Sequence, residues 1–241
     1  MMNSALCLST LLVVNVVLSQ AAVLSTCPST DDVKVQKKII EKTNYYRKIV
    51  QPSARNMLEV SWSNEAAKNA AKWAKQCKFE HSKPEEREIE NYSCGENLYM
   101  TSEPAPWDEA FKAFDNEKKD FRYGKGATSK AAVTGHYTQQ IWYNSRLMGC
   151  ACAHCPGGEY EYFYVCQYCP PGNFVDSLDK PYKEGSKCAD CPKNCKDGLC
   201  TNPCTDKNIF SNCPDLAKKN CGMPFVKEKC AASCNCKTEI I

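Results

Sequence analysis

Histidine is scarce in this chain of 241 residues, which contains only three, so chemistry that needs imidazole has few possible positions. Neither sign of charge dominates, because 31 basic and 28 acidic residues leave a net charge of +3. A nucleic-acid-binding protein needs a clustered basic face, so this balance argues against nucleic acid as a partner. The 11 glycines are scattered and form no phosphate-binding loop, and the HExxH zinc-protease motif is absent.

Long hydrophobic runs are also missing, except at the start of the chain. Residues 1–21 carry no charge, and the apolar run over 5–18 is followed by the small residues of Ser19-Gln20-Ala21. This pattern predicts a secretory signal peptide over 1–21, although the usual basic start is missing. A membrane anchor is the alternative, but the run is short and interrupted by polar residues. We expect a soluble protein that is secreted and extracellular.

Cysteine, by contrast, is abundant. Of the 19 cysteines, Cys7 lies in the predicted signal peptide, which leaves an even number of 18. A zinc ribbon is one interpretation of spacings such as Cys188-x2-Cys191. In an oxidising compartment, thiols this dense favour disulfides instead.

Cysteine density divides the chain into two parts. Residues 27–149 hold three cysteines, whereas residues 188–236 hold ten. We therefore expect a first domain over 22–175 with a real hydrophobic core, a hinge over 176–203 and a tail over 204–241. A tail this short cannot bury enough apolar surface to fold unaided, so disulfides must hold it together.

Helical periodicity marks three segments of the first domain. Apolar residues recur at helical spacing over 39–50, and Pro52 ends the pattern. Ser63 can cap an alanine-rich helix that continues to residue 74. A third helix is expected to open near Pro106, with an apolar stripe that runs from Trp107 to Phe121.

Two aromatic segments, 137–143 and 160–168, are predicted strands. Helices mixed with strands in this length indicate an α+β or three-layer domain. Glu117 falls on the apolar face of the third predicted helix, where a buried carboxylate needs a partner. The candidate partners are a histidine or the stem of a lysine or arginine.

Three motifs resemble those of the CAP superfamily. Residues 135–142, GHYTQQIW, resemble its first signature, and residues 164–173, YVCQYCPPGN, resemble its second. Cys94-Gly95-Glu96-Asn97 is similar to its internal Gly-Glu-Asn motif. The cysteine spacing of 188–204, and C-x8-C-x7-C-x8-C-x3-C-x-C from Cys204 onward, are similar to the cysteine-rich secretory proteins, or CRISPs. The resemblance covers residue 33 to the C-terminus.

This resemblance implies an α+β fold, with a three-layer α-β-α sandwich followed by a stapled hinge and a helical cysteine-rich tail. It also implies a cleft lined by two histidines and two glutamates that bind zinc in some members. The matching positions are His81, Glu96, Glu117 and His136. Two imidazoles with carboxylates suit Zn²⁺, but a hydrogen-bonded network without metal is an equal alternative. His154 has no counterpart in the family and is expected on a loop.

The resemblance further implies a disulfide pattern. The implied pairs are Cys77–Cys155, Cys94–Cys169, Cys150–Cys166, Cys188–Cys195, Cys191–Cys200, Cys204–Cys236, Cys213–Cys230 and Cys221–Cys234. Cys27 and Cys152 are additional to this set. We expect them to pair with each other, although a bridge between two chains or two free thiols are alternatives.

One residue differs from the family signature, and a separate motif indicates glycosylation. Gln140 stands where the first signature has an aliphatic residue. Asn91-Tyr92-Ser93 is a sequon for N-glycosylation, which indicates a surface loop.

The tail carries six lysines against four acids, which suits the acidic mouth of an ion channel. We expect a monomeric, non-enzymatic protein that binds an ion channel or a cell-surface receptor. A spacer or adhesion module, a gamete-surface, sterol- or lipid-binding protein, and a metal-dependent hydrolase are the alternatives. The candidate channel-contact residues are Lys207, Phe210, Lys218, Lys219, Phe225 and Lys227.

Overall fold

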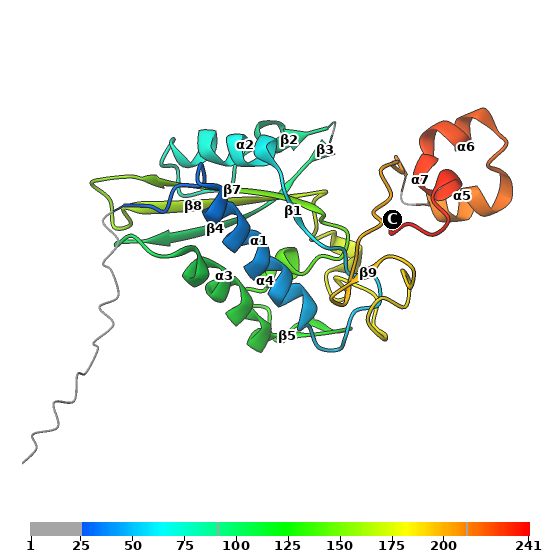
Figure 1. Ribbon diagram of the computed structural model, residues 1–241, viewed down its shortest axis with the longest axis horizontal. Helices are drawn as coiled ribbons and strands as arrows, with labels where there is room; N and C mark the ends of the chain where they lie inside the picture. Colours follow the sequence, from blue (N-terminus) through cyan, green and yellow to red (C-terminus); the bar gives the residue numbers. More distant parts are fainter. Residues whose placement is uncertain (1–25, 91, 211) are drawn as a thin grey trace, which may run out of the picture.

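The computed structural model describes residues 26–90, 92–210 and 212–241 (Figure 1). The predicted signal peptide and Asn91 of the sequon lie outside the described residues. Among the residues described, no helix combines the length and the apolar character that crossing a membrane requires.

A four-stranded sheet forms the centre of the first domain. Its strand order is β1 (Ser61–Trp62), β7 (Leu147–His154), β8 (Tyr162–Cys169) and β4 (Gly95–Thr101). β7 and β8 form an antiparallel pair, β4 is antiparallel to β8, and β1 is parallel to β7. All eight residues of β8 are buried, because helices cover both faces of the sheet.

The helices lie in two layers. α1 (Val33–Lys48), α3 (Trp107–Asn116) and α4 (Gly135–Gln140) cover one face of the sheet, and α2 (Asn64–Ala74) covers the other (Figure 1). The side chains of β8 alternate accordingly. Tyr164, Cys166 and Tyr168 pack with residues of α1 and α3, whereas Phe163 and Val165 pack with residues of α2. This arrangement confirms the expected three-layer α-β-α sandwich.

Gly149 lies where α2 approaches the sheet most closely. A Cβ built at this position would lie 2.0 Å from the backbone nitrogen of Ala67, so only glycine fits. The Ser63 side chain caps α2 by accepting the N–H of Ala66, as the sequence predicts.

The prediction for the third helix is correct at its start and wrong at its end. α3 begins after Pro106 but stops at Asn116, and a short 3₁₀ turn, Glu117–Asp120, follows. Phe121 therefore lies outside the helix and opens β5 (Phe121–Arg122), which pairs with β6 (Gly126–Ala127). The ring of Phe121 contacts Tyr137 instead, in a second apolar cluster of the first domain.

The predicted strand at 137–143 is wrong, because this segment contains helix α4 and the turn after it. The Glu117 carboxylate accepts the N–H groups of His136 and Tyr137 at 2.9 and 3.0 Å. These amides belong to the first turn of α4, so a distant carboxylate caps a helix that lacks a local cap.

The expectation that His154 lies on a loop is wrong, because His154 is the last residue of strand β7. Its ring stacks on that of Tyr162, with centroids 4.9 Å apart, and its Nε2 lies 3.5 Å from the Glu161 carboxylate. The strand itself was not predicted, because its sequence LMGCACAH lacks β-branched residues. A small β2 (Glu88–Ile89) and β3 (Tyr92–Ser93) ribbon lies beside α2.

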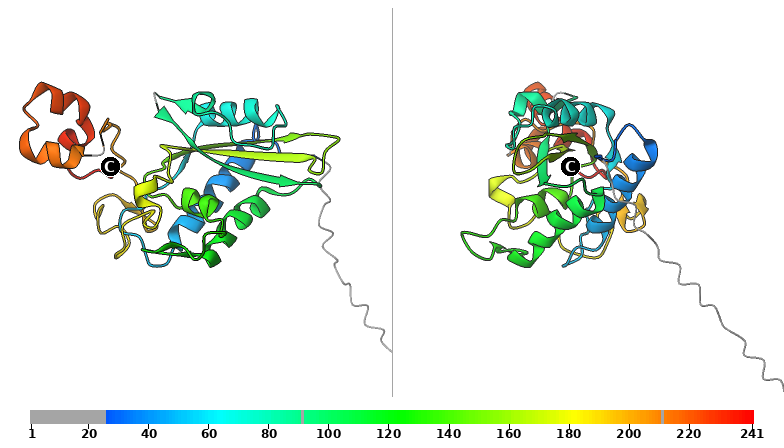
Figure 2. Two further views of the ribbon diagram at one scale, coloured as in Figure 1. Left: turned by 180° about the vertical axis from the view of Figure 1, so that it is seen from behind. Right: turned by 90° about the vertical axis from the view of Figure 1, so that its left-hand side faces the viewer.

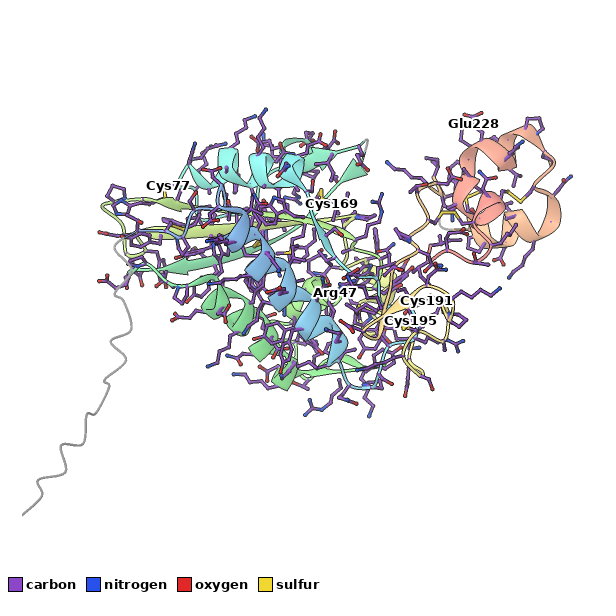
Figure 3. All side chains as sticks on the ribbon, in the orientation of Figure 1. Arg47, Cys77, Cys169, Cys191, Cys195 and Glu228 are labelled. Atoms are coloured by element: carbon purple, nitrogen blue, oxygen red, sulfur yellow. A yellow bond between two sulfur atoms is a disulfide. The ribbon has the colours of Figure 1, made fainter. Side chains whose placement is uncertain are left out.

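The hinge packs against the first domain. Its hairpin consists of β9 (Cys195–Lys196) and β10 (Leu199–Cys200), and Cys200 forms an isolated β-bridge with Leu58 of the first domain. Tyr182 is buried in the second apolar cluster of the first domain. Figure 3 shows Cys191 and Cys195 in this region, beside the first domain.

Three short helices lie in the described part of the tail, α5 (Cys213–Asn220), α6 (Pro224–Lys229) and α7 (Ala231–Asn235). This confirms a helical, disulfide-rich tail, which projects from the first domain (Figure 2). The last residues return to the hinge. Ile240 is buried against Leu58 and the hinge cysteines, and the Tyr143 hydroxyl donates to the Ile241 carbonyl at 2.6 Å.

The described residues form nine disulfides, and these are the eight pairs that the resemblance implies plus Cys27–Cys152. The Cα atoms of Cys27 and Cys152 lie 5.9 Å apart. This bond ties the segment before α1 to strand β7.

Candidate functional site

The first His/Glu pair joins the loop after α2 to strand β4. Nδ1 of His81 lies 3.0 Å from Oε1 of Glu96, whose side chain is fully buried. The same carboxylate accepts the N–H and the hydroxyl of Ser82 at 2.9 and 2.8 Å, and the Gln167 amide at 3.2 Å. The carboxylate is therefore fully hydrogen-bonded, as a buried charge must be.

These contacts decide the protonation of Glu96. Burial alone raises the pKa of its carboxyl group, but hydrogen bonds from His81 and Ser82 and the nearby Arg87 guanidinium outweigh burial. The pKa of Glu96 consequently lies below its ordinary value. Glu96 is ionised at neutral pH and acts as a hydrogen-bond acceptor.

The second pair joins the end of α3 to the start of α4. Nδ1 of His136 lies 2.6 Å from Oε1 of Glu117, and the other oxygen of Glu117 accepts the two backbone N–H groups that open α4. The imidazole of His136 stacks on Phe114, with centroids 5.3 Å apart and planes 12° apart. Stacking and hydrogen bonding together fix the orientation of this ring.

Strand β4, at the edge of the sheet, contains Glu96 of the first pair and contacts His136 of the second. Glu96 and Gln167 are paired residues on the side that α2 covers, whereas Asn97 points to the opposite side. There the Asn97 amide donates to the His136 carbonyl at 2.9 Å. A Cβ at Gly95 would lie 1.9 Å from Oε1 of Gln139, so the glycine of the Gly-Glu-Asn motif allows α4 to approach β4.

Both histidines use Nδ1 to contact their glutamate. An ionised carboxylate can only accept, so Nδ1 of each ring is the donor to its glutamate, and in the neutral ring Nε2 then keeps a lone pair. Carboxylates that orient histidines in this way are typical partners of metal-ligating imidazoles. If a metal is held here, Nε2 of His81 and Nε2 of His136 are the ring atoms left to ligate it, with Glu96 and Glu117 orienting the two rings.

The four residues do not form one compact ligand cluster within the described part of the chain. The one group of three candidate ligands found there, with donor atoms within 4.8 Å of one another, is Cys188, Cys191 and Cys200. Their sulfurs are in disulfides, so they offer no thiolate to a metal.

Arg47 is a buried residue that the sequence did not single out. Near the end of α1 (Figure 3), its guanidinium donates to the carbonyls of Leu58, Gln140, Trp142 and Tyr143 at 2.7 to 3.1 Å. Burial lowers the pKa of Arg47 to about 9, which still leaves it charged at neutral pH. Arg47 thus holds the segment after α4 against α1.

Gln140, the departure from the first signature, is also fully buried. Neither polar atom of its side chain has a hydrogen-bond partner among the described residues. An aliphatic residue would avoid this cost, since burying an unpaired amide is unfavourable.

The channel-contact candidates of the tail differ in exposure. Phe210 and Phe225 are 41% and 54% exposed, and their rings stack with centroids 5.9 Å apart. Lys218 pairs with Asp215, whereas the described contacts include no ion pair of Lys219 or Lys227. Lys207 donates to the backbone carbonyl of Glu90 in the first domain at 3.1 Å.

Fold, cysteine framework and paired His/Glu residues together define a CAP domain followed by a cysteine-rich module. The profile of the "Cysteine-rich secretory protein family" matches residues 40–168, and the profile "Crisp" matches residues 188–241. This chain belongs to the cysteine-rich secretory protein family.

Solved structures agree with this assignment. The crystal structure of NaASP2 with Zn²⁺ is 30% identical with a TM-score of 0.61, and the match covers 73% of this chain and 100% of that one. Na-ASP-1 is 26% identical with a TM-score of 0.59, covering 74% of this chain and 50% of that one. Venom allergen-like protein 4 of Schistosoma mansoni is 27% identical with a TM-score of 0.52, covering 63% and 96%.

Proposed function

We propose that this chain is a secreted, monomeric, non-enzymatic binding protein that modulates an ion channel through its tail. The observation that carries the proposal is the exposed Phe210–Phe225 pair on a compact, separately stapled body. Lys219 and Lys227 add positive charge to that body. A cationic knob with exposed aromatic rings is complementary to the acidic mouth of a cation channel.

The contacts of the two glutamates support a non-catalytic role for the two His/Glu pairs. A metal-dependent hydrolase needs a carboxylate that is free to act as general base. Glu96 and Glu117 instead use their oxygens to accept hydrogen bonds from histidine rings, backbone amides and neighbouring side chains. The two His/Glu pairs are therefore better suited to holding an ion than to moving protons.

The proposal includes zinc as the ion. NaASP2 was crystallised with Zn²⁺, and His81 and His136 would hold the metal here through Nε2. We predict that the double substitution His81→Ala and His136→Ala abolishes zinc binding in calorimetry and leaves the tail disulfides unchanged in peptide mapping. The variant His154→Ala serves as the matched control, because its ring contacts Tyr162 and Glu161 and belongs to neither His/Glu pair. Zinc affinity that survives the double substitution would contradict this site.

The channel proposal is tested by electrophysiology on voltage-gated calcium and potassium channels and on a ryanodine receptor. The full-length protein is compared with Phe210→Ser/Phe225→Ser and with the control Val133→Ser/Val175→Ser, which removes exposed apolar residues from the first domain. Block by the full-length protein and the control, but not by the phenylalanine variant, is the expected result. No current change with the full-length protein on any channel would overturn the proposal.

Lipid binding is a second candidate, which two cavities beside α1 favour. One of about 710 Å³ is lined by Val35, Tyr45, Pro106 and Trp107 together with charged residues of α1. The other, of about 750 Å³, is lined by Tyr46, Phe121 and Tyr137 together with charged residues that include Asp115 and Lys118. Both are large enough for a sterol or an acyl chain. Saturable binding of a labelled sterol that Trp107→Ala weakens would support this function.

A further inference from the structure

The tail exposes large apolar side chains close together. Ile209, Phe210, Met223 and Phe225 are 61%, 41%, 51% and 54% exposed, and we call these four residues the apolar patch. The stacked rings of Phe210 and Phe225 hold the segments 209–210 and 223–225 together. A backbone hydrogen bond of 2.7 Å from Ile209 to Lys229 also fastens the first segment to α6. A contiguous exposed apolar surface on a small protein usually marks a binding surface.

The composition of the tail distinguishes between possible partners. Residues 204–241 contain no Trp, Tyr or Arg, the residues that dominate the hot spots of protein–protein interfaces. They contain instead Phe, Ile and Met beside six lysines. Apolar side chains accompanied by lysines are typical of surfaces that bind at the interface of a lipid bilayer.

The lysines of the tail support the same partner. Lys218 and Lys229 pair with Asp215 and Glu228 at 3.1 and 2.6 Å. Lys219 and Lys227 make no such ion pair within the described part of the tail. Lys227 lies one turn or less from Met223 and Phe225, since its N–H donates to the Met223 carbonyl at 2.9 Å. A cation beside exposed apolar side chains is complementary to lipid phosphates.

We propose that the apolar patch inserts into the headgroup region of an anionic phospholipid membrane, with Lys219 and Lys227 contacting lipid phosphates. A bilayer surface suits a convex patch, because it needs no matching pocket. This function goes beyond channel modulation and does not require a channel. It would concentrate the tail on membranes, where a channel partner is found.

The test is co-sedimentation of the full-length protein with vesicles of phosphatidylcholine alone and of phosphatidylcholine with phosphatidylserine. We expect binding that phosphatidylserine strengthens. Phe210→Ser/Phe225→Ser should weaken binding to both vesicles at least about tenfold, because two exposed rings no longer leave water. Lys219→Gln/Lys227→Gln should mainly remove the preference for phosphatidylserine, by about fivefold for each lysine.

The matched control is Val133→Ser/Val175→Ser, which changes side chains that are 61% and 84% exposed on the remainder of the protein. Disulfide mapping of each variant checks that the tail keeps its native pairing. Absence of vesicle binding, or equal loss in the control, would overturn the proposal. Vesicle binding without an effect on any channel would support the membrane proposal and count against the channel proposal. Channel block without vesicle binding would support the channel proposal and overturn the membrane proposal.

Discussion

Disulfides have different roles in the first domain and in the tail. In the first domain, Cys150 and Cys166 lie in a core cluster that is filled mainly by aromatic and aliphatic side chains. In the tail, three of the four buried members of the cluster, Cys213, Cys230 and Cys234, are cysteines, and Val226 is the fourth. The same bond thus reinforces a core in one region and constitutes most of the core in the other. The two regions should therefore respond differently to the same substitution.

The largest effect is expected from removing one disulfide in each region. Cys213→Ser/Cys230→Ser should unfold the whole tail, because a segment this short lacks another core. Cys77→Ser/Cys155→Ser should cost the first domain about 2–4 kcal/mol and leave it folded. Amide hydrogen exchange of α6 and β8 measures both outcomes. If the amides of α6 stay protected from exchange in Cys213→Ser/Cys230→Ser, the tail does not depend on its disulfides more than the first domain does.

Arg47→Met should destabilise the first domain alone, by at least about 3 kcal/mol, because four buried carbonyls lose a charged donor. Arg47→Lys should not rescue it, since an ammonium group cannot reproduce the planar array of donors. Denaturant unfolding followed by tryptophan fluorescence is selective, because all four tryptophans lie before the hinge. The control is Arg122→Met, at the exposed residue of β5. A loss below about 1 kcal/mol would contradict the role of Arg47.

Ile240→Ser should loosen the connection between the regions. Burial of one isoleucine contributes about 1.5–3 kcal/mol, and Ile240 is only 7% exposed in the cluster with Leu58. Faster exchange is expected at the amide of Cys204, which donates to the Ile240 carbonyl. Ile241→Ser, at a residue that is 42% exposed, is the control. Equal effects of the two substitutions would argue against docking through Ile240.

The smallest effect is a pH dependence of the first domain. The pKa of Glu96 is lowered on folding, so its contribution to stability is complete above the ordinary value of 4.5. That contribution is lost as the pH falls through the lower, folded-state pKa. The difference in Tm between the wild type and Glu96→Gln should therefore be largest near neutral pH and shrink in acid. A difference that grows in acid would contradict the direction of the shift.

Local signals in the sequence predict much of this fold. Ser63 and the alanines after it specify α2, and the aromatic run at 160–168 specifies β8, because cap and side-chain preference act within a few residues. The resemblance predicts His81, Glu96, Glu117 and His136 as site residues, and their pairing into two His/Glu contacts emerges only from the structure.

Interactions between distant residues explain what the sequence missed. The segment 137–143 carries strand-forming residues, yet the Glu117 carboxylate caps it as a helix from 19 residues away. Arg47 occupies the end of a helix with other polar residues, and nothing local indicates that four carbonyls enclose it. Lys207 is similar, because its contact with Glu90 depends on how the tail meets the rest of the chain.

The order of the strands in the sheet has a consequence for biosynthesis. β8 lies between β7 and β4, so the sheet cannot close before residue 169 has been made. The disulfide partners of Cys77 and Cys94 are synthesised 78 and 75 residues later in the chain. At common rates of synthesis this delay is roughly 4 to 16 seconds. During that time these thiols stand unpaired in the growing chain, whereas every cysteine of the hinge meets its partner within nine residues.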